Sequence, residues 1–184
     1  MSARPGASLH VFLRGEMVGE IEKRGPSRYR FTYSESTLAG HRVGATILSA
    51  SLPVRSEVFA PREAAPFFEG LLPEGSVRAA IARSFRLSEE DGFGLLEALG
   101  ADCAGAVAVL SPGTSPAPTG GGRLRPLDAR QLKDLIDDLP RNPLGVSPSA
   151  DGARLSLGGI QHKLVLAGSA PDRLSQPLNG APST

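Results

Sequence analysis

Residues 28–33, Arg28-Tyr29-Arg30-Phe31-Thr32-Tyr33, alternate charged or polar side chains with aromatic ones. Successive side chains of a strand point to opposite faces, so this stretch predicts a strand with one buried aromatic face and one wet face. Residues 9–13 and 17–21 are also strand-like, and turns at Arg14-Gly15-Glu16 and Gly25-Pro26 separate the three stretches. The beginning of the chain therefore predicts an antiparallel β-meander.

Composition limits the function classes. The 184 residues carry 20 Lys+Arg and 19 Asp+Glu, a net charge of +1, so no strong field attracts nucleic acid or an anionic membrane. The aromatic row is accordingly predicted to be core and not a base-stacking platform. Cys103 is the single cysteine, which excludes an internal disulfide and fits a reducing compartment. No apolar run approaches the ~18 residues of a membrane span, and no secretory h-region follows Met1, so a cytoplasmic protein is expected.

The middle of the chain changes from strand to helix patterns. Residues 43–52 predict a further strand, which Pro53 would end. A first helix is expected to open at Pro61, a second to cover residues 74–85, and a third to start at Ser88 as its N-cap. Residues 106–110, Ala-Val-Ala-Val-Leu, predict a buried strand.

Residues 111–122 (SPGTSPAPTGGG) are uncharged and rich in turn formers, which is typical of a linker. After it, residues 127–139 predict an amphipathic helix, and residues 151–178 return to a β pattern. The aspartates of that helix are predicted to form a solvated face and not a metal site: Asp128, Asp134, Asp137 and Asp138. The expected class is α+β, with an N-terminal subdomain over 1–110, a linker over 111–122 and the start of a second region over 123–184.

Residues 154–166 form the stretch that is most typical of a ligand-binding site. It reads as strand, glycine pair, strand, with Ser156 before Gly158-Gly159 and Lys163 after them. Backbone N–H groups and one cation in such a loop can contact phosphate oxygens. The stretch matches neither G-x-x-x-x-G-K-[ST] nor G-x-G-x-x-G, and the chain has no H-R-D or D-F-G signature. The residue pattern by itself therefore favours a plain β-hairpin.

Four stretches, in the right order, together resemble the HipA family of bacterial serine/threonine kinase toxins. Residues 67–75 (FFEGLLPEG) resemble its F-F-x-N-L-L-P-E-G segment, with Gly70 replacing the usual Asn, and residues 102–107 (DCAGAV) resemble its D-C-x-G-A-V segment. Residues 156–164 (SLGGIQHKL) are similar to S-[IL]-[AP]-G-[AV]-Q-x-K-x, and residues 177–184 (PLNGAPST) resemble the family's run into the next strand. The resemblance covers nearly the whole chain.

This resemblance changes the interpretation of the loop. In the family the loop lies over ATP, so the resemblance implies ATP-binding residues at the matching positions: Gly158, Gly159, Ile160, Gln161, His162 and Lys163. Ser156 matches a serine that family members autophosphorylate, which expels the loop and silences the kinase. A phosphoserine carries about −1.5 to −2 charge and cannot easily share a small pocket with ATP phosphates. The implied fold after residue 122 is the start of a protein-kinase-like N-lobe.

The resemblance also implies a function: a type II toxin that phosphorylates a protein substrate, of aminoacyl-tRNA synthetase type, with ATP and Mg²⁺. The implied partner is a helix-turn-helix, HipB-like antitoxin, through which DNA is contacted indirectly. The family's phosphate-gripping lysine and its catalytic and Mg²⁺-binding aspartates match no residue up to Thr184. Phosphoryl transfer needs these groups, so no catalytic residue is assigned and these residues alone are expected to be inactive.

Two other interpretations stay open. The chain could be a free-standing, non-catalytic module that restrains a partner kinase, a role that residues 1–110 would suit and that leaves the glycine-rich loop without a purpose. It could also be an unrelated β-rich domain with a coincidental hairpin.

Overall fold

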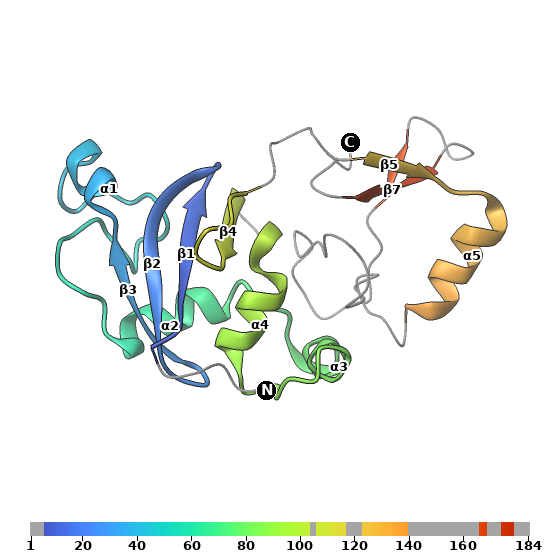
Figure 1. The fold of residues 1–184 in the computed structure, drawn as a ribbon, viewed down its shortest axis with the longest axis horizontal. Helices are drawn as coiled ribbons and strands as arrows, with labels where there is room; N and C mark the ends of the chain where they lie inside the picture. The colour runs from blue at the N-terminus through green and yellow to red at the C-terminus, as the bar shows by residue number, and fades with distance from the viewer. Residues whose placement is uncertain (1–5, 104–105, 117–122, 140–165, 169–173, 179–184) are drawn as a thin grey trace.

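The computed structural model of the chain describes residues 6–103, 106–116, 123–139, 166–168 and 174–178. It shows two groups of elements (Figure 1), a four-stranded sheet with helices α1 to α4 and a smaller group of three strands with helix α5. Both sheets are antiparallel. The expected α+β class is confirmed.

The larger sheet contains the predicted meander. Strands β1 (Ser8–Leu13), β2 (Glu16–Gly25) and β3 (Arg28–Tyr33) follow one another, and β4 (Val107–Leu110) pairs with β1, which gives the order β3-β2-β1-β4. Arg14 and Gly15 link β1 to β2 with φ angles of 53° and 87°. A two-residue hairpin turn with both φ angles positive matches the natural twist of the strands. The Arg14 N–H donates to the Ala106 carbonyl at 2.9 Å, which attaches this turn to the residue before β4.

Strand β3 alternates as predicted. Tyr29 and Phe31 are fully buried and Tyr33 is nearly so, whereas Arg28 and Arg30 are exposed. The Phe31 ring lies so close to β2 that a Cβ at Gly19 would stand 2.6 Å from it. Glycine at position 19 therefore allows the aromatic face to pack directly on the neighbouring strand.

Helices α2 (Pro61–Glu69) and α4 (Gly92–Leu99) cover this aromatic face. The Tyr29 ring contacts Phe68 of α2 with 6.0 Å between ring centroids and Phe93 of α4 with 6.3 Å. Aromatic rings at this spacing and tilt attract one another beyond the area that they bury. The core thus lies where β3 and these two helices meet.

The remaining helices of this group are α1 (Glu35–Gly40), α3 (Gly75–Ser84) and the short 3₁₀ helix η1 (Gly100–Asp102). The helices expected to open at Pro61 and to cover residues 74–85 are confirmed, as is the buried strand at β4. The predicted start of α4 is wrong. Its N-cap is Asp91, whose side chain accepts from the Gly94 N–H at 3.2 Å, and Ser88 lies in the preceding turn. Asp91 is buried against Lys23, so burial decides which of the two residues caps the helix.

The strand predicted over residues 43–52 is also wrong. This segment is a loop with one isolated bridge, between Ser49 and Leu52. Hydrogen bonds from the Gly44 N–H to the Val54 carbonyl and from the Val54 N–H to the Ala45 carbonyl, both 2.8 Å, close it on itself. The edge of β3 that it could have joined pairs with Phe59 instead. The segment is apolar because it caps the core and not because it extends the sheet.

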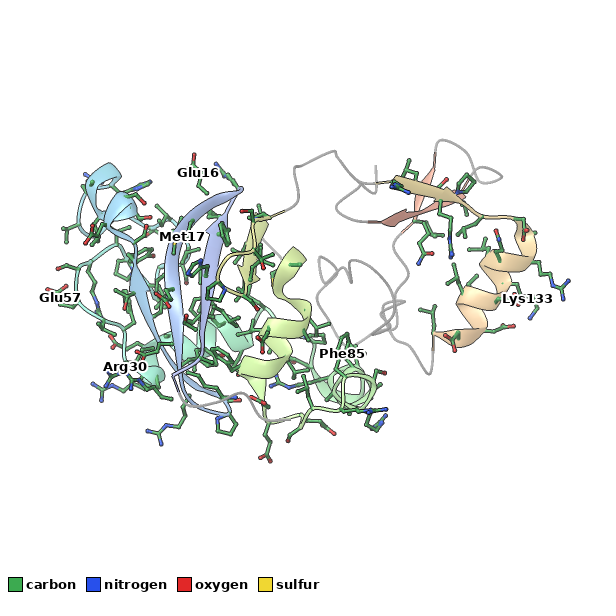
Figure 2. All side chains as sticks on the ribbon, in the orientation of Figure 1. Glu16, Met17, Arg30, Glu57, Phe85 and Lys133 are labelled. Atoms are coloured by element: carbon green, nitrogen blue, oxygen red, sulfur yellow. The ribbon has the colours of Figure 1, made fainter. Side chains whose placement is uncertain are left out.

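The smaller group consists of β5 (Arg123–Pro126), α5 (Ala129–Asp138), β6 (Ala167–Gly168) and β7 (Leu174–Leu178), with the strand order β5-β7-β6. The helix predicted over residues 127–139 is confirmed. The β pattern predicted for residues 151–178 is confirmed at the two strands described there, β6 and β7. Asp128, predicted to belong to the solvated face of the helix, is the N-cap of α5 and exchanges hydrogen bonds with Gln131. No residue of α5 is buried, and Figure 2 shows Lys133 pointing away from the rest of this group.

Candidate functional site

The nucleotide loop predicted from sequence lies outside the described residues. Ser156 and residues 158–163 all fall within residues 140–165, of which the structure describes nothing. The described chain resumes at Leu166, and β6 follows at once. The roles assigned to these residues therefore stay predictions.

Of the four motifs, residues 67–75 are described completely, residues 102–107 in part, and residues 177–184 only at positions 177 and 178, in β7. Residues 67–75 join α2 to α3, with Phe68 fully buried. In the second motif, the Cys103 N–H donates to the Val107 carbonyl at 3.0 Å and its thiol donates to the Gly100 carbonyl at 3.7 Å. Cys103 is buried, and its described contacts are structural.

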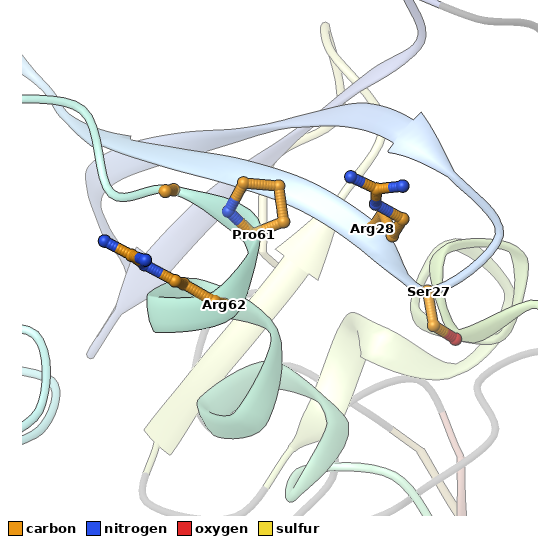
Figure 3. Close-up of a pocket in the computed structure, with 5 residues that line it drawn as sticks. Ser27, Arg28, Pro61 and Arg62 are labelled. Atoms are coloured by element: carbon orange, nitrogen blue, oxygen red, sulfur yellow. The ribbon is translucent and has the colours of Figure 1, made fainter.

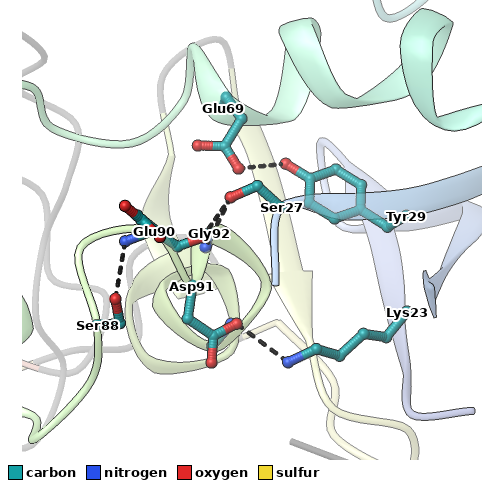
Figure 4. A network of polar contacts seen from close by, with 9 residues as sticks. Lys23, Ser27, Tyr29, Glu69, Ser88, Glu90, Asp91 and Gly92 are labelled. Carbon is teal, nitrogen blue, oxygen red and sulfur yellow. Dashed lines mark hydrogen bonds and ion pairs between the residues drawn. The ribbon is translucent and has the colours of Figure 1, made fainter. Parts of the chain in front are cut away.

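A buried ion pair is the most unusual polar feature of the described residues. The Lys23 ammonium lies 3.0 Å from Oδ1 of Asp91, and both side chains are almost completely buried. The ammonium also lies 5.1 Å from the centroid of the Phe93 ring, a cation–π distance. Figure 4 shows this contact between β2 and the start of α4. A buried charge is tolerated only with such partners, so the pair fixes how the two elements meet.

A second set of contacts joins β3 to α2 and α3. The Tyr29 hydroxyl donates to Oε1 of Glu69 at 2.9 Å, and Oε2 of Glu69 lies 2.9 Å from the Arg78 guanidinium. Arg78 also donates to the Glu89 carbonyl at 2.7 Å. Burial, with the neighbouring Glu69 carboxylate, raises the pKa of Tyr29 well above its usual range. The hydroxyl therefore remains a protonated donor at neutral pH.

Ser27, in the turn between β2 and β3, completes the polar cluster. Its hydroxyl donates to the Glu90 carbonyl at 2.6 Å and accepts from the Gly92 N–H at 3.2 Å (Figure 4). The Phe93 N–H donates to the Pro26 carbonyl at 3.1 Å. These contacts hold the turn between β2 and β3 against the start of α4, and we refer to the cluster of Ser27, Glu90 and Gly92 as the clamp.

The sequence interpretation missed this cluster, although one signal was available. Gly19, Ile21 and Lys23 share the period of two that defines the buried face of β2. A lysine at a core position demands a carboxylate partner. Nothing local identifies Asp91 as that partner, because it lies in another part of the sequence.

A shallow hollow lies beside the clamp, between the start of β3 and the first turn of α2. It has a volume of about 530 Å³ and is lined by Ser27, Arg28, Ala60, Pro61 and Arg62. In Figure 3 the side chains of Arg28 and Arg62 flank Pro61. Both arginines are exposed. The lining of the hollow therefore combines the apolar Ala60 and Pro61 with two cationic side chains.

No group of three or more His, Cys, Asp or Glu side chains among the described residues could hold a metal ion. Among the helices that the structure describes, none is both long enough and apolar enough to span a membrane.

Comparison with known proteins gives consistent matches. Residues 9–110 match the model of the HipA N-terminal domain. Over 179 residues the chain is 37% identical to a Sinorhizobium fredii protein named "Putative kinase Y4mE", covering 96% of this chain and 41% of that one. It is 28% identical over 172 residues to the serine/threonine-protein kinase toxin HipA of Shewanella oneidensis, covering 90% of this chain and 36% of the toxin.

A solved structure shares the fold. It is the Shewanella oneidensis complex of HipA, HipB and operator DNA, one chain of which matches with a TM-score of 0.67 and 24% identity over 96% of this chain and 39% of that chain. The chain spans about two fifths of the length of these relatives. The family model covers more than half of the chain, and the chain belongs to the HipA N-terminal domain family.

Proposed function

We propose that this chain is the N-terminal part of a HipA-like serine/threonine kinase, the toxin of a type II toxin–antitoxin pair. The observation that carries the proposal is the extent of the similarity to the Sinorhizobium fredii protein. A match over 96% of the chain includes the glycine-rich loop, since that loop lies well inside both ends. The similarity thus extends beyond the HipA N-terminal domain at residues 9–110.

In this proposal the loop residues Gly158, Gly159, Ile160, Gln161, His162 and Lys163 cover the phosphates of ATP. Glycines let backbone N–H groups approach phosphate oxygens closely, and Lys163 adds a positive charge. Mg²⁺ would neutralise charge on the nucleotide during transfer to a protein hydroxyl. The proposed substrate class is a protein of aminoacyl-tRNA synthetase type, on the strength of the family resemblance.

Ser156 is the proposed off-switch of the kinase. Its phosphorylation would add a charge of about −1.5 to −2 beside the ATP phosphates. Repulsion would then favour a loop position outside the nucleotide site. Arg154 and His162 lie close enough in sequence to offer the phosphoserine another partner.

The proposed partner is a helix-turn-helix antitoxin of HipB type. Support comes from the solved relative, which is a complex of HipA, HipB and operator DNA. The net charge of +1 favours DNA contact through the antitoxin over direct binding. The single buried cysteine fits the reducing cytoplasm as the place of action.

Residues 1–184 alone are proposed to be inactive, because none of them matches the family's catalytic or Mg²⁺-binding aspartates. Calorimetric titration of the 184-residue chain with Mg-ATP tests this directly. We expect no tight binding, and a Mg²⁺-dependent Kd in the low micromolar range would contradict an incomplete site.

A paired variant tests the loop itself. Within the kinase that contains these residues, Lys163→Ala should weaken ATP binding, whereas Lys133→Ala, at an exposed site on α5, should not. Equal effects of the two substitutions would contradict the assignment of the loop.

A free-standing module that restrains a partner kinase is the second candidate. It is favoured by one observation, the match of residues 9–110 to a domain model of their own. The reading frame after Thr184 distinguishes the two candidates. A stop codon followed by a separate kinase gene would support the module, and a continuing lysine-bearing strand would support the kinase.

A further inference from the structure

We infer that the hollow between β3 and α2 is a docking site for an acidic segment of a protein partner, with Arg28 and Arg62 as the residues that bind its carboxylates. The inference rests on the geometry of this hollow and is independent of the proposed kinase function. It concerns a surface formed wholly by described residues, namely Ser27, Arg28, Ala60, Pro61 and Arg62.

The guanidinium groups of Arg28 and Arg62 are available to bind a ligand. Neither side chain makes a hydrogen bond or an ion pair with another described residue, whereas three arginines of neighbouring elements and loops are paired. Arg24 pairs with Glu22, Arg55 with Glu63 and Arg78 with Glu69. A guanidinium offers a fork of N–H donors that matches a carboxylate. Two such forks at the rim of one hollow favour an anionic ligand.

Three buried or half-buried carboxylates of the same group of elements do not serve as that ligand, because each already has its partners. Glu63 accepts from Arg55 and from the Ala60 N–H, both at 2.9 Å. Glu69 is held by Tyr29 and Arg78, and Asp91 by Lys23. The residues that line the hollow include no carboxylate of their own, so an acidic ligand would have to be supplied by another molecule.

The walls of the hollow are fixed before any ligand arrives. Ser27 is held by Glu90 and Gly92. On the other side, Phe59 exchanges backbone hydrogen bonds with Phe31, at 2.8 and 3.2 Å, directly before Ala60 and Pro61. The Arg55 guanidinium covers the Phe59 ring at 3.7 Å from its centroid. Binding therefore needs to order only the two exposed arginine side chains and not the backbone that carries them, which limits the entropy lost.

Charge distribution selects a short acidic segment over nucleic acid. Exposed carboxylates interrupt the field around the hollow, with Glu22 opposite Arg30 on the neighbouring strand and Glu90 beside Ser27. Binding of a nucleic-acid backbone draws on a continuous row of cations that contact successive phosphates. Two guanidinium groups beside the apolar Ala60 and Pro61 suit one or two carboxylates carried on a peptide.

The test uses the 184-residue chain and a short fluorescein-labelled peptide of alternating glutamate and glycine, followed by fluorescence anisotropy at low salt. The double variant Arg28→Gln/Arg62→Gln removes the proposed contacts. The matched control, Arg83→Gln/Arg130→Gln, removes the same charge from exposed arginines of α3 and α5. Circular dichroism of both variants verifies folding.

We expect saturable binding that the Arg28/Arg62 variant weakens about tenfold or more, as loss of charge-assisted contacts predicts, and that the control variant changes less than about twofold. Amide NMR shifts should change around Arg28 and Arg62. If both variants weakened peptide binding equally, the binding would depend only on the net charge of the protein, and the inference would be overturned. Absence of binding at millimolar peptide would also overturn it, as would tighter binding of an oligothymidine that the Arg28/Arg62 variant abolishes, which would indicate nucleic acid.

Discussion

The two groups of elements bury their side chains very differently. In the larger sheet and its helices, a continuous core includes rings from β3, α2 and α4. In the smaller group, every residue of β5 is exposed and α5 has no buried residue. Folding requires buried apolar area to offset the loss of chain entropy. The larger group therefore supports itself, and substitutions in it should matter much more than equivalent substitutions in the smaller group.

The largest expected effect comes from deleting a core ring. Phe68→Ala should lower the free energy of unfolding by about 3–5 kcal/mol, because the ring is fully buried and a cavity remains. The matched change in the smaller group, Leu135→Ala on the unburied helix α5, should cost less than about 1 kcal/mol. Urea denaturation followed by circular dichroism measures both. Similar costs at the two sites would contradict the difference between the groups.

The buried ion pair should give the next largest effect. Asp91→Ala leaves the Lys23 charge buried without its partner and removes the N-cap of α4. A cost of about 3–5 kcal/mol is expected for breaking a buried pair from one side.

A double-mutant cycle with Lys23→Met separates the pair from the cap. If Asp91→Ala costs nearly as much in the Lys23→Met background as in the wild type, the ion pair is not what joins β2 to α4. We expect a much smaller cost in that background, since the unpaired charge is gone.

These features explain how far the sequence predicts the structure. The meander and the helices that begin at Pro61 and Gly75 could be predicted, because hydrophobic periodicity and turn residues are local features of the sequence. The start of α4 does not, because Ser88 and Asp91 are both good N-caps and only burial against Lys23 selects Asp91. Residues 43–52 have a strand-like composition, but the edge of β3 pairs with Phe59. Of the candidate site, the loop at 156–163 rests on sequence resemblance, and the hollow requires residues from β3 and α2 that no local pattern connects.

Alkaline pH should destabilise the larger group through Tyr33. Burial raises the pKa of Tyr33 from 10.0 to about 12, so the folded chain keeps the phenolic proton that the unfolded chain loses. Stability is then fully present below about pH 10 and falls as pH rises toward about 12, by at most ~1.4 kcal/mol per pH unit for one proton. Tyr33→Phe should flatten this fall in a pH series of urea denaturation curves.

Other groups titrate in the same range, so only the difference between the two proteins is informative. At neutral pH, Tyr33→Phe should also cost about 1 kcal/mol, because the hydroxyl donates to the Leu52 carbonyl at 2.5 Å. Parallel pH profiles for Tyr33→Phe and the wild type would mean that Tyr33 does not contribute.

The smallest expected effect is that of an exposed lysine–aspartate pair in the smaller group. Lys133 and Asp137 pair on the exposed face of α5, one helical turn apart. Solvent screens such a pair, and many exposed pairs contribute nothing measurable. Lys133→Ala should therefore leave the denaturation midpoint unchanged, in contrast to changes at Asp91. A shift of the midpoint comparable to that of Asp91→Ala would show that the smaller group depends on this pair.

Phosphopeptide mapping tests the proposed kinase function most directly. The kinase containing these residues is incubated with Mg-ATP, digested with trypsin and analysed by mass spectrometry. Cleavage after Arg154 and Lys163 releases residues 155–163, in which Ser156 is the single hydroxyl side chain, while Ser147 and Ser149 leave on a different peptide. We predict phosphate on residues 155–163 that disappears in Ser156→Ala and persists in Ser149→Ala. Phosphate found on other peptides and never on this one would contradict the account.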